Sequence, residues 1–175
     1  EFFAVRAVRQ LRHPGTRAEL GLMLRYVGHL RVLCTQDHTA TAEVLTSCDS
    51  VPLGAWVVPF EPLPIPMISI SAPLNFCDPA STKATGYIIY AKDDWPDFGM
   101  DHMVMIDLGE PDQVSPGTIL TIFRDNPVEG APRLLLGEMA VMVTGQHWAS
   151  ARIFRSTDFI HTGDRPNTTN CQNCH

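Results

Sequence analysis

The sequence of 175 residues has few charged residues and no long apolar run, and both shortages exclude classes of protein. Lysine and arginine number only 13, scattered along the chain, and the net charge is −6. Phosphate binding needs clustered basic residues, so we expect no nucleic-acid partner. The longest apolar stretch, residues 134–143, contains a glutamate and is about half of the roughly 20 residues that a membrane helix needs. We therefore expect no membrane span.

The sequence also lacks the motifs of common enzyme classes. Gly-x-Ser-x-Gly, His-Glu-x-x-His, a P-loop and a dinucleotide fingerprint are all absent. The acidic residues Asp93, Asp94 and Asp97 lie in a turn-rich stretch, which favours a solvated loop over paired acid–base catalysis or calcium binding. We therefore predict that the protein is not an enzyme.

The first residues contain no signal peptide, because no basic segment precedes an apolar run there. The numbering begins with Glu1 instead of methionine, which predicts a mature chain whose export signal has been removed. We expect the protein in the periplasm, on the cell surface or outside the cell.

The last five residues, Cys171-Gln172-Asn173-Cys174-His175, form a C-x-x-C-H pattern, the attachment motif of c-type haem. Two thiols at this spacing can form thioethers with the two vinyl groups of one porphyrin, and the adjacent histidine then lies under the iron as an axial ligand. Chance would produce the pattern roughly 0.006 times in a chain of this composition. We predict one haem c per chain, held by Cys171 and Cys174, with His175 as the proximal iron ligand.

Three other chemistries could use the terminal cysteines: a disulfide, a thioredoxin-like redox pair or a zinc site. A redox pair needs a βαβ context with a helix N-terminus that lowers the thiol pKa, and a zinc site needs a fourth ligand. The pattern favours haem. The alternative is a structural envelope protein without haem, whose terminal C-x-x-C is a disulfide or a metal site.

A gapless internal repeat relates residues 28–54 to residues 137–163 at a constant offset of 109. Nine of the 27 pairs are identical, including the glycines at both ends. Such self-similarity indicates two copies of one supersecondary unit. Within each copy, apolar and polar residues alternate over 39–46 and 148–154, which is typical of strands with one face in a core.

The repeat defines the expected fold, which is all-β, with two small β-barrel-like or sandwich-like domains and a short haem-carrying tail. Preceding strands are expected over residues 2–9 and 118–124. In chain order, we expect a first domain over 1–60, a Pro-rich linker over 61–83, a second domain over 84–165 and a haem-binding tail over 166–175.

Four stretches carry a likeness to a known family: residues 3–10 with Arg12-His13-Pro14, then Val58-Pro59-Phe60, residues 104–109 and residues 115–120. They resemble the β-rich region that follows the LysM module in bacterial cell-envelope proteins. This resemblance covers most of residues 1–165 and implies a small all-β fold and an envelope location. It does not imply peptidoglycan binding, because the LysM module itself is missing. The C-x-x-C-H tail departs from that family and resembles c-type cytochromes in the motif alone.

A second axial ligand is expected from the remaining histidines, which are His13, His29, His38, His102, His147 and His161. His38 and His147 occupy equivalent repeat positions near turns, where a structural role is favoured, and His13 is expected to pack or cap a turn. Methionines at alternating strand positions are more often core residues than ligands. His161 and His102 are the preferred candidates, from the same chain or from a neighbouring subunit.

These expectations combine into a monohaem c-type cytochrome of the cell envelope or exterior that transfers electrons between redox partners. The polar tail cannot wrap a haem by itself and must borrow a pocket from its own β-domain or from a neighbour's. We therefore expect identical subunits to associate in a filament or another homo-oligomer, with a monomer as the alternative. The pairing of Cys34, Cys48 and Cys77 stays open.

Overall fold

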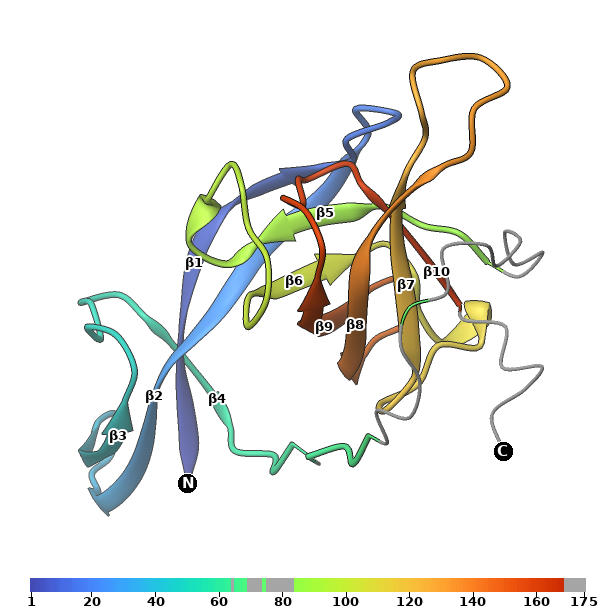
Figure 1. Ribbon diagram of the computed structural model, residues 1–175. Helices are drawn as coiled ribbons and strands as arrows, with labels where there is room; N and C mark the ends of the chain where they lie inside the picture. Colours follow the sequence, from blue (N-terminus) through green and yellow to red (C-terminus); the bar gives the residue numbers. More distant parts are fainter. Residues whose placement is uncertain (64, 69–73, 75–83, 169–175) are drawn as a thin grey trace. The chain divides into compact units, whose positions relative to one another are not determined.

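The computed structural model describes residues 1–63, 65–68, 74 and 84–168 (Figure 1). Regular structure in these residues is almost entirely β, which confirms the expected fold class. Two 3₁₀ turns, η1 (Lys92–Asp94) and η2 (Glu110–Asp112), are the helical elements among them. No helix in the described part of the chain is long and apolar enough to cross a membrane.

The strands form two antiparallel sheets. The chain divides into two compact units: unit 1 comprises Glu1–Arg12 and Ala18–Leu63, and unit 2 comprises His13–Arg17 and Pro64–His175. The strands of unit 1 are β1 (Phe2–Arg12), β2 (Glu19–Thr35), β3 (Ala40–Ser47) and β4 (Trp56–Pro59). Those of unit 2 are β5 (Ile88–Ala91), β6 (Met103–Ile106), β7 (Ile119–Arg124), β8 (Leu134–Thr144), β9 (Ala149–Ser156) and β10 (Arg165–Thr168). Their spatial orders are β3-β2-β1-β4 and β10-β7-β8-β9-β6-β5.

The strand registers confirm the repeat. In the hairpin β2–β3, the pairs run from Gly28↔Ser47 to Thr35↔Ala40. The hairpin β8–β9 repeats every one of these pairs at the offset of 109, from Gly137↔Ser156 to Thr144↔Ala149, and its two register shifts fall at the same places. A shift of one residue would turn every apolar side chain to the opposite face, so a shared register means a shared inner face.

The repeat extends beyond the hairpins to four strands. Ala4 of β1 pairs with Gly28 of β2 and with Val57 of β4. Ile122 of β7 occupies the equivalent place, between Gly137 of β8 and Pro166 of β10. Each set has three consecutive antiparallel strands and a fourth that returns beside the first, which is the Greek-key order 4-1-2-3. The preceding strands expected over residues 2–9 and 118–124 are β1 and β7, and they lie outside the gapless alignment because their offset is 118 instead of 109.

Unit 2 adds the hairpin β5–β6 to its four repeated strands. β6 pairs with the outer edge of β9, and β5 pairs with β6. On the opposite edge, Gly86 and Ile88 donate backbone hydrogen bonds to the carbonyl oxygens of Pro166 (3.0 Å) and Asp164 (2.8 Å). These bonds join the two edges of the curled sheet.

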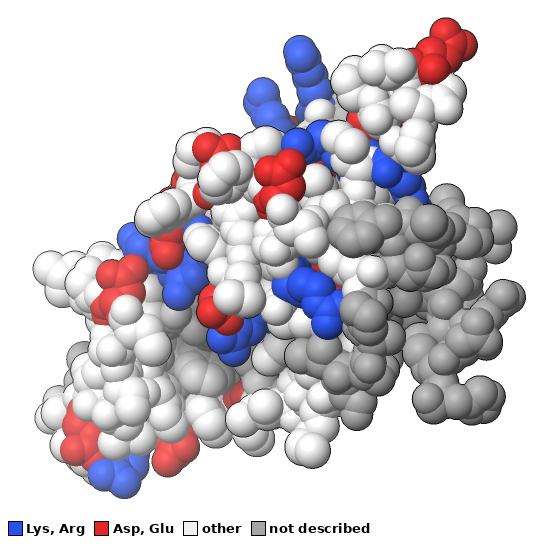
Figure 2. All heavy atoms as spheres, viewed as in Figure 1, with Lys and Arg blue, Asp and Glu red and all other residues white. Residues whose placement is uncertain are grey.

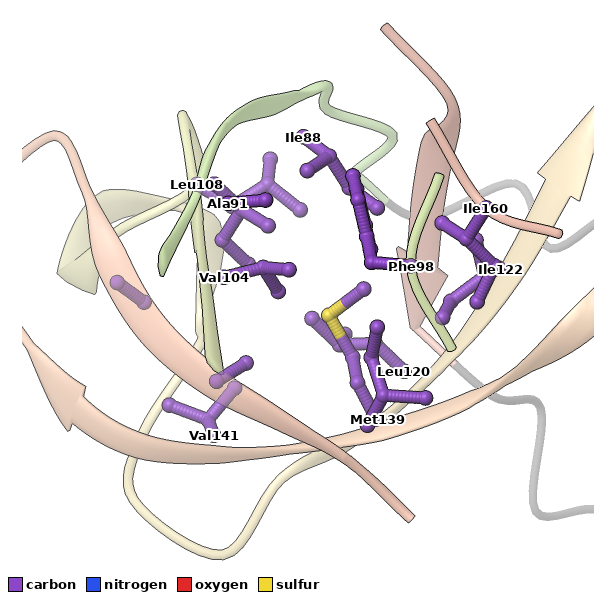
Figure 3. Close-up of a cluster of buried hydrophobic side chains, with 14 of the residues drawn as sticks. Ile88, Ala91, Phe98, Val104, Leu108, Leu120, Ile122, Met139, Val141 and Ile160 are labelled. Carbon is purple, nitrogen blue, oxygen red and sulfur yellow. The ribbon is translucent and has the colours of Figure 1, made fainter. Parts of the chain in front are cut away.

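The joined edges enclose the main core of unit 2 (Figure 3). Its buried members come from every strand except β10 and from the connecting loops: Ile88, Ala91, Phe98, Val104, Ile106, Leu108, Val114, Leu120, Ile122, Leu136, Met139, Val141, Ala149, Ala151, Ile153 and Ile160. The buried apolar residues of unit 1 are fewer and smaller, namely Ala4, Val5, Leu11 and Val27.

Strand β10 extends the second domain beyond its expected end at residue 165. It covers Arg165–Thr168, so residues 166–168 of the stretch expected as a tail are paired with β7. Residues 169–175, and most of the stretch expected as a linker, lie outside the described residues.

The partly buried ion pair between Glu138 of β8 and Arg155 of β9 predicts a pH-dependent stability. Burial raises the pKa of Glu138 above its ordinary value of 4.5, and the charge of Arg155 only partly offsets this shift. The folded state therefore binds more protons than the unfolded state at pH values just above 4.5, so the free energy of unfolding contributed by Glu138 falls as the pH rises.

We compare the free energies of unfolding of the wild type and the Glu138→Gln variant. The value for the wild type minus that for the variant should fall as the pH rises from about 4 to about 7. Urea titrations at several pH values measure it. A difference that rises over this interval would contradict the assignment.

Candidate functional site

The proximal half of the expected haem site lies outside the described residues, because it consists of Cys171, Cys174 and His175. Cys77 also lies outside them. The described thiols, Cys34 and Cys48, are free and exposed, so they are not bonded to each other. The structure can therefore be compared with the sequence only for the candidate distal ligands and their surroundings.

Four of the histidines do not line the candidate pocket described below: two make contacts within the fold and two are exposed near turns. His13 accepts hydrogen bonds at Nδ1 from the backbone N–H groups of Gly15 and Thr16, each at 3.0 Å, and its Nε2 lies 2.8 Å from Asp107. It caps the turn after β1, as expected. The ring of His29 stacks on Phe60 at a centroid distance of 4.3 Å. His38 and His147 are exposed between the strands of the two repeated hairpins.

His161 is held by both of its ring nitrogens. Its Nε2 lies 2.6 Å from Asp97 Oδ1, and its Nδ1 lies 2.6 Å from a guanidinium nitrogen of Arg124. Because arginine can only donate, Nδ1 is the acceptor and Nε2–H donates to Asp97. His161 would have to give up one of these hydrogen bonds to bind iron.

The Arg124 side chain is fixed in turn by Asp164, which is only 5% exposed. Two guanidinium nitrogens donate to the two carboxylate oxygens, each at 2.7 Å, and the backbone N–H of His161 donates to the same carboxylate at 2.8 Å. The hydrogen bond from Asp164 raises the pKa of Arg124 more than burial lowers it. Sequence analysis missed this pair, although a signal existed: Asp164 takes the place of Ala55 in the repeat.

His102 has a different environment. Its Nδ1 lies 3.2 Å from the carbonyl oxygen of Gly99 and 3.3 Å from that of Met100, and the N–H of Gly99 lies farther away at 3.4 Å. The tautomer that carries hydrogen on Nδ1 satisfies the two shorter contacts. The Nε2 atom has no hydrogen-bond partner among the described residues. This is the usual arrangement of a metal-binding histidine, in which one ring nitrogen donates to a carbonyl and the other is left for the metal.

His102 lines a surface pocket of about 500 Å³ in unit 2, a volume within the usual range for ligand sites. Three aromatic residues, Trp95, Phe98 and Phe159, line it together with Gly99 and with polar residues from both sides: Asp97, His102, Ser156, Thr157 and Asp158. The Trp95 ring meets His102 edge-on at 5.9 Å. Trp95 is 58% exposed and Phe159 is 68% exposed.

Backbone pairing places the two walls of this pocket together. Phe98, in the loop before β6, exchanges hydrogen bonds of 3.0 and 2.9 Å with Ile160, in the loop after β9. On one side of this bridge the chain carries Trp95 and His102, and on the other it carries Phe159.

The lining of the pocket contains the residue types that one side of a haem site needs. An aromatic wall suits a flat macrocycle, and a single imidazole nitrogen is all that the protein must supply on the distal side. Within the described ranges no cluster of three or more histidine, cysteine, aspartate or glutamate side chains could hold a metal ion by itself. On the face shown in Figure 2, the charged side chains of described residues are of both signs and interspersed.

No protein-family model matches the sequence, and no curated protein matches it significantly.

The Asp164–Arg124 pair should contribute strongly to the stability of unit 2. Replacing Asp164 by asparagine leaves the partly buried guanidinium without its counter-charge, and we expect a loss of about 2–3 kcal/mol in the free energy of unfolding. The matched control is Asp101→Asn, which breaks the exposed Arg152–Asp101 pair and should change stability by less than about 1 kcal/mol. Denaturant unfolding measures both, and equal losses would contradict the argument.

Proposed function

We propose that the protein is a monohaem c-type cytochrome of the cell envelope or exterior, which transfers electrons as part of an assembly of identical subunits. The observation that carries this proposal is the C-x-x-C-H sequence of residues 171–175. The pocket around His102 supports it independently, because it offers an unpartnered imidazole nitrogen beside an aromatic wall.

Each group has a defined role in this proposal. Cys171 and Cys174 hold the haem covalently, His175 is the proximal ligand and His102 is the distal ligand. Bound haem supplies one-electron redox chemistry. The carbonyl oxygens of Gly99 and Met100 orient the His102 ring through Nδ1, which leaves Nε2 for the iron.

The aromatic side chains contribute through burial. Trp95, Phe98 and Phe159 line the pocket and would exclude water from one face of the macrocycle. Burial and axial-ligand identity are two of the properties by which a protein sets a haem potential. The protein thus tunes an electron carrier and contributes no acid–base step.

The two axial histidines can come from one chain or from two. The seven residues after Thr168 span up to about 23 Å when extended, which limits how far from the end of β10 His175 can bind a haem. Exposed Trp95 and Phe159 favour association. A head-to-tail contact of this kind that does not close produces a filament with a row of haems.

Covalent attachment is tested by extraction. We expect native protein to keep its haem absorption after extraction with acidified acetone, because thioethers hold the porphyrin to the chain. Replacing Cys171 and Cys174 together by alanine should abolish this absorption and leave the strand-rich circular dichroism unchanged. Native protein without haem absorption would favour the alternative, a structural envelope protein with a terminal disulfide or metal site.

The distal ligand is tested by a matched pair of variants. His102→Ala should convert six-coordinate low-spin haem to a five-coordinate or water-ligated high-spin form in the visible spectrum, and added imidazole should restore the low-spin bands. His161→Ala, the control, should keep the low-spin spectrum, because that ring is bonded to Asp97 and Arg124. The opposite pattern would transfer the role to His161.

A further inference from the structure

Unit 1 has the inner surface of a curled sheet but lacks the strands that cover this surface in unit 2. Nine core residues of unit 2 lie on the repeated strands and the loop after them, and all nine counterparts in unit 1 are apolar. We call these nine residues of unit 1 the open face: Phe2, Ala4, Val27, Leu30, Val32, Ala40, Ala42, Val44 and Val51.

The counterparts differ in exposure along the outer strand β3 and in the loop after it, whereas Ala4 and Val27 on the two central strands are each only 1% exposed. Ile153 of unit 2 is 0% exposed, whereas Val44, which corresponds to it, is 54% exposed. Ile160 is 0% exposed and its counterpart Val51 is 39% exposed. The difference arises because β5 and β6 cover the inner face in unit 2, and no equivalent hairpin pairs with β3 or β4 in the part of unit 1 that the structure describes.

The edges of the open face are also available for pairing. β3 and β4 are the two outer strands of the unit 1 sheet. The equivalent edge in unit 2, on β9, pairs with β6. The sequence of β3 contains neither lysine nor proline, the residues with which proteins commonly block an edge strand. β4 contains one such residue, Pro59, at its last position.

We propose that a second copy of the chain covers the open face, with the two unit 1 sheets related by a two-fold axis parallel to their strands. β1 is antiparallel to β2 and to β4, and β2 is antiparallel to β3. β3 and β4 therefore run in opposite directions, so such an axis brings β3 of each copy antiparallel to β4 of the other. The eight strands then close into one barrel, a size whose interior side chains can fill.

The chemistry of the open face suits self-association. None of its nine residues carries a charge, so two identical faces can meet without burying a charge. Two charged pairs of unit 1, Arg31–Glu43 and Arg6–Asp49, consist of residues outside the set.

The area of the open face suits a dimer. Four strands spaced about 4.8 Å apart and about six residues long cover roughly 19 by 20 Å in plan. Two copies therefore present about 800 Å² in plan, and accessible surface, which follows the side chains, is larger. With the two edge pairings added, the contact is comparable to the roughly 1,200 Å² at which specific interfaces begin.

The test uses the full chain with Cys171 and Cys174 replaced by alanine, so that association through a haem-bearing tail makes no contribution. Sedimentation equilibrium at micromolar concentrations should give the mass of two chains. Adding Val44→Asp places a charge in the interface and should produce the mass of one chain. Ala42→Asp should do the same and provides a second variant on the same strand.

The matched control is Leu33→Asp. Leu33 is 60% exposed in β2 and is not one of the nine residues, so its replacement should leave the dimer intact. Circular dichroism establishes that each variant is folded. If the folded Cys171→Ala, Cys174→Ala chain had the mass of one chain, the proposal would be overturned. The open face would then be covered by another part of the same chain or by a different partner. Equal effects of Val44→Asp and Leu33→Asp would overturn it too. Neither result bears on haem attachment, which is measured separately by extraction.

Discussion

Covering the apolar inner face of a four-stranded Greek-key sheet is the constraint on which this protein depends. In both units, alternation of apolar and polar residues gives the sheet one apolar face, and the shared bulges keep the same positions on it. An apolar face of this size is unfavourable in water because burial contributes about 25 cal/mol per Å². In each unit, other residues must therefore pack on this apolar face and exclude water from it.

In unit 2 the strands β5 and β6 of the same chain cover this face, and the loop between them carries part of the candidate site. β5 and β6 join the outer strands, and the loop between these two added strands carries Trp95, Phe98 and His102. Phe98 is buried and holds the loop to Ile160 through the backbone, while Trp95 and His102 line the pocket outside the core. One wall of the pocket is thus formed by the loop between the two strands that unit 2 has in addition to unit 1, and the other wall by Ser156 of β9 and residues 157–159.

The differences between the two copies of the repeat mark where unit 2 has acquired specific interactions. Asp164 replaces Ala55, and the arginine that pairs with it, Arg124, corresponds by strand pairing to Arg6. Lacking this aspartate, Arg6 pairs with Asp49 at 2.8 Å instead. The Asp164–Arg124 pair also fixes His161, and this separates the two histidines that the sequence alone presented as equivalent candidates.

The sequence by itself determined the all-β class, the repeated hairpins and the presence of a terminal C-x-x-C-H pattern, because each depends on residues close together in the chain. Period-two alternation sets a strand's face, a tight turn sets a hairpin's register, and C-x-x-C-H is contained in five residues. Three features were decided only by the tertiary structure. Backbone hydrogen bonds join Gly86 and Ile88 to Pro166 and Asp164, His161 is hydrogen-bonded at both ring nitrogens whereas His102 is bonded at one, and Val44 is exposed. These features depend on partners far away in sequence: Arg124 is 37 residues from His161, and Asp97 is 64 residues from it. Val44 and Ile153 have the same local pattern, and they differ only because a distant hairpin covers one of them.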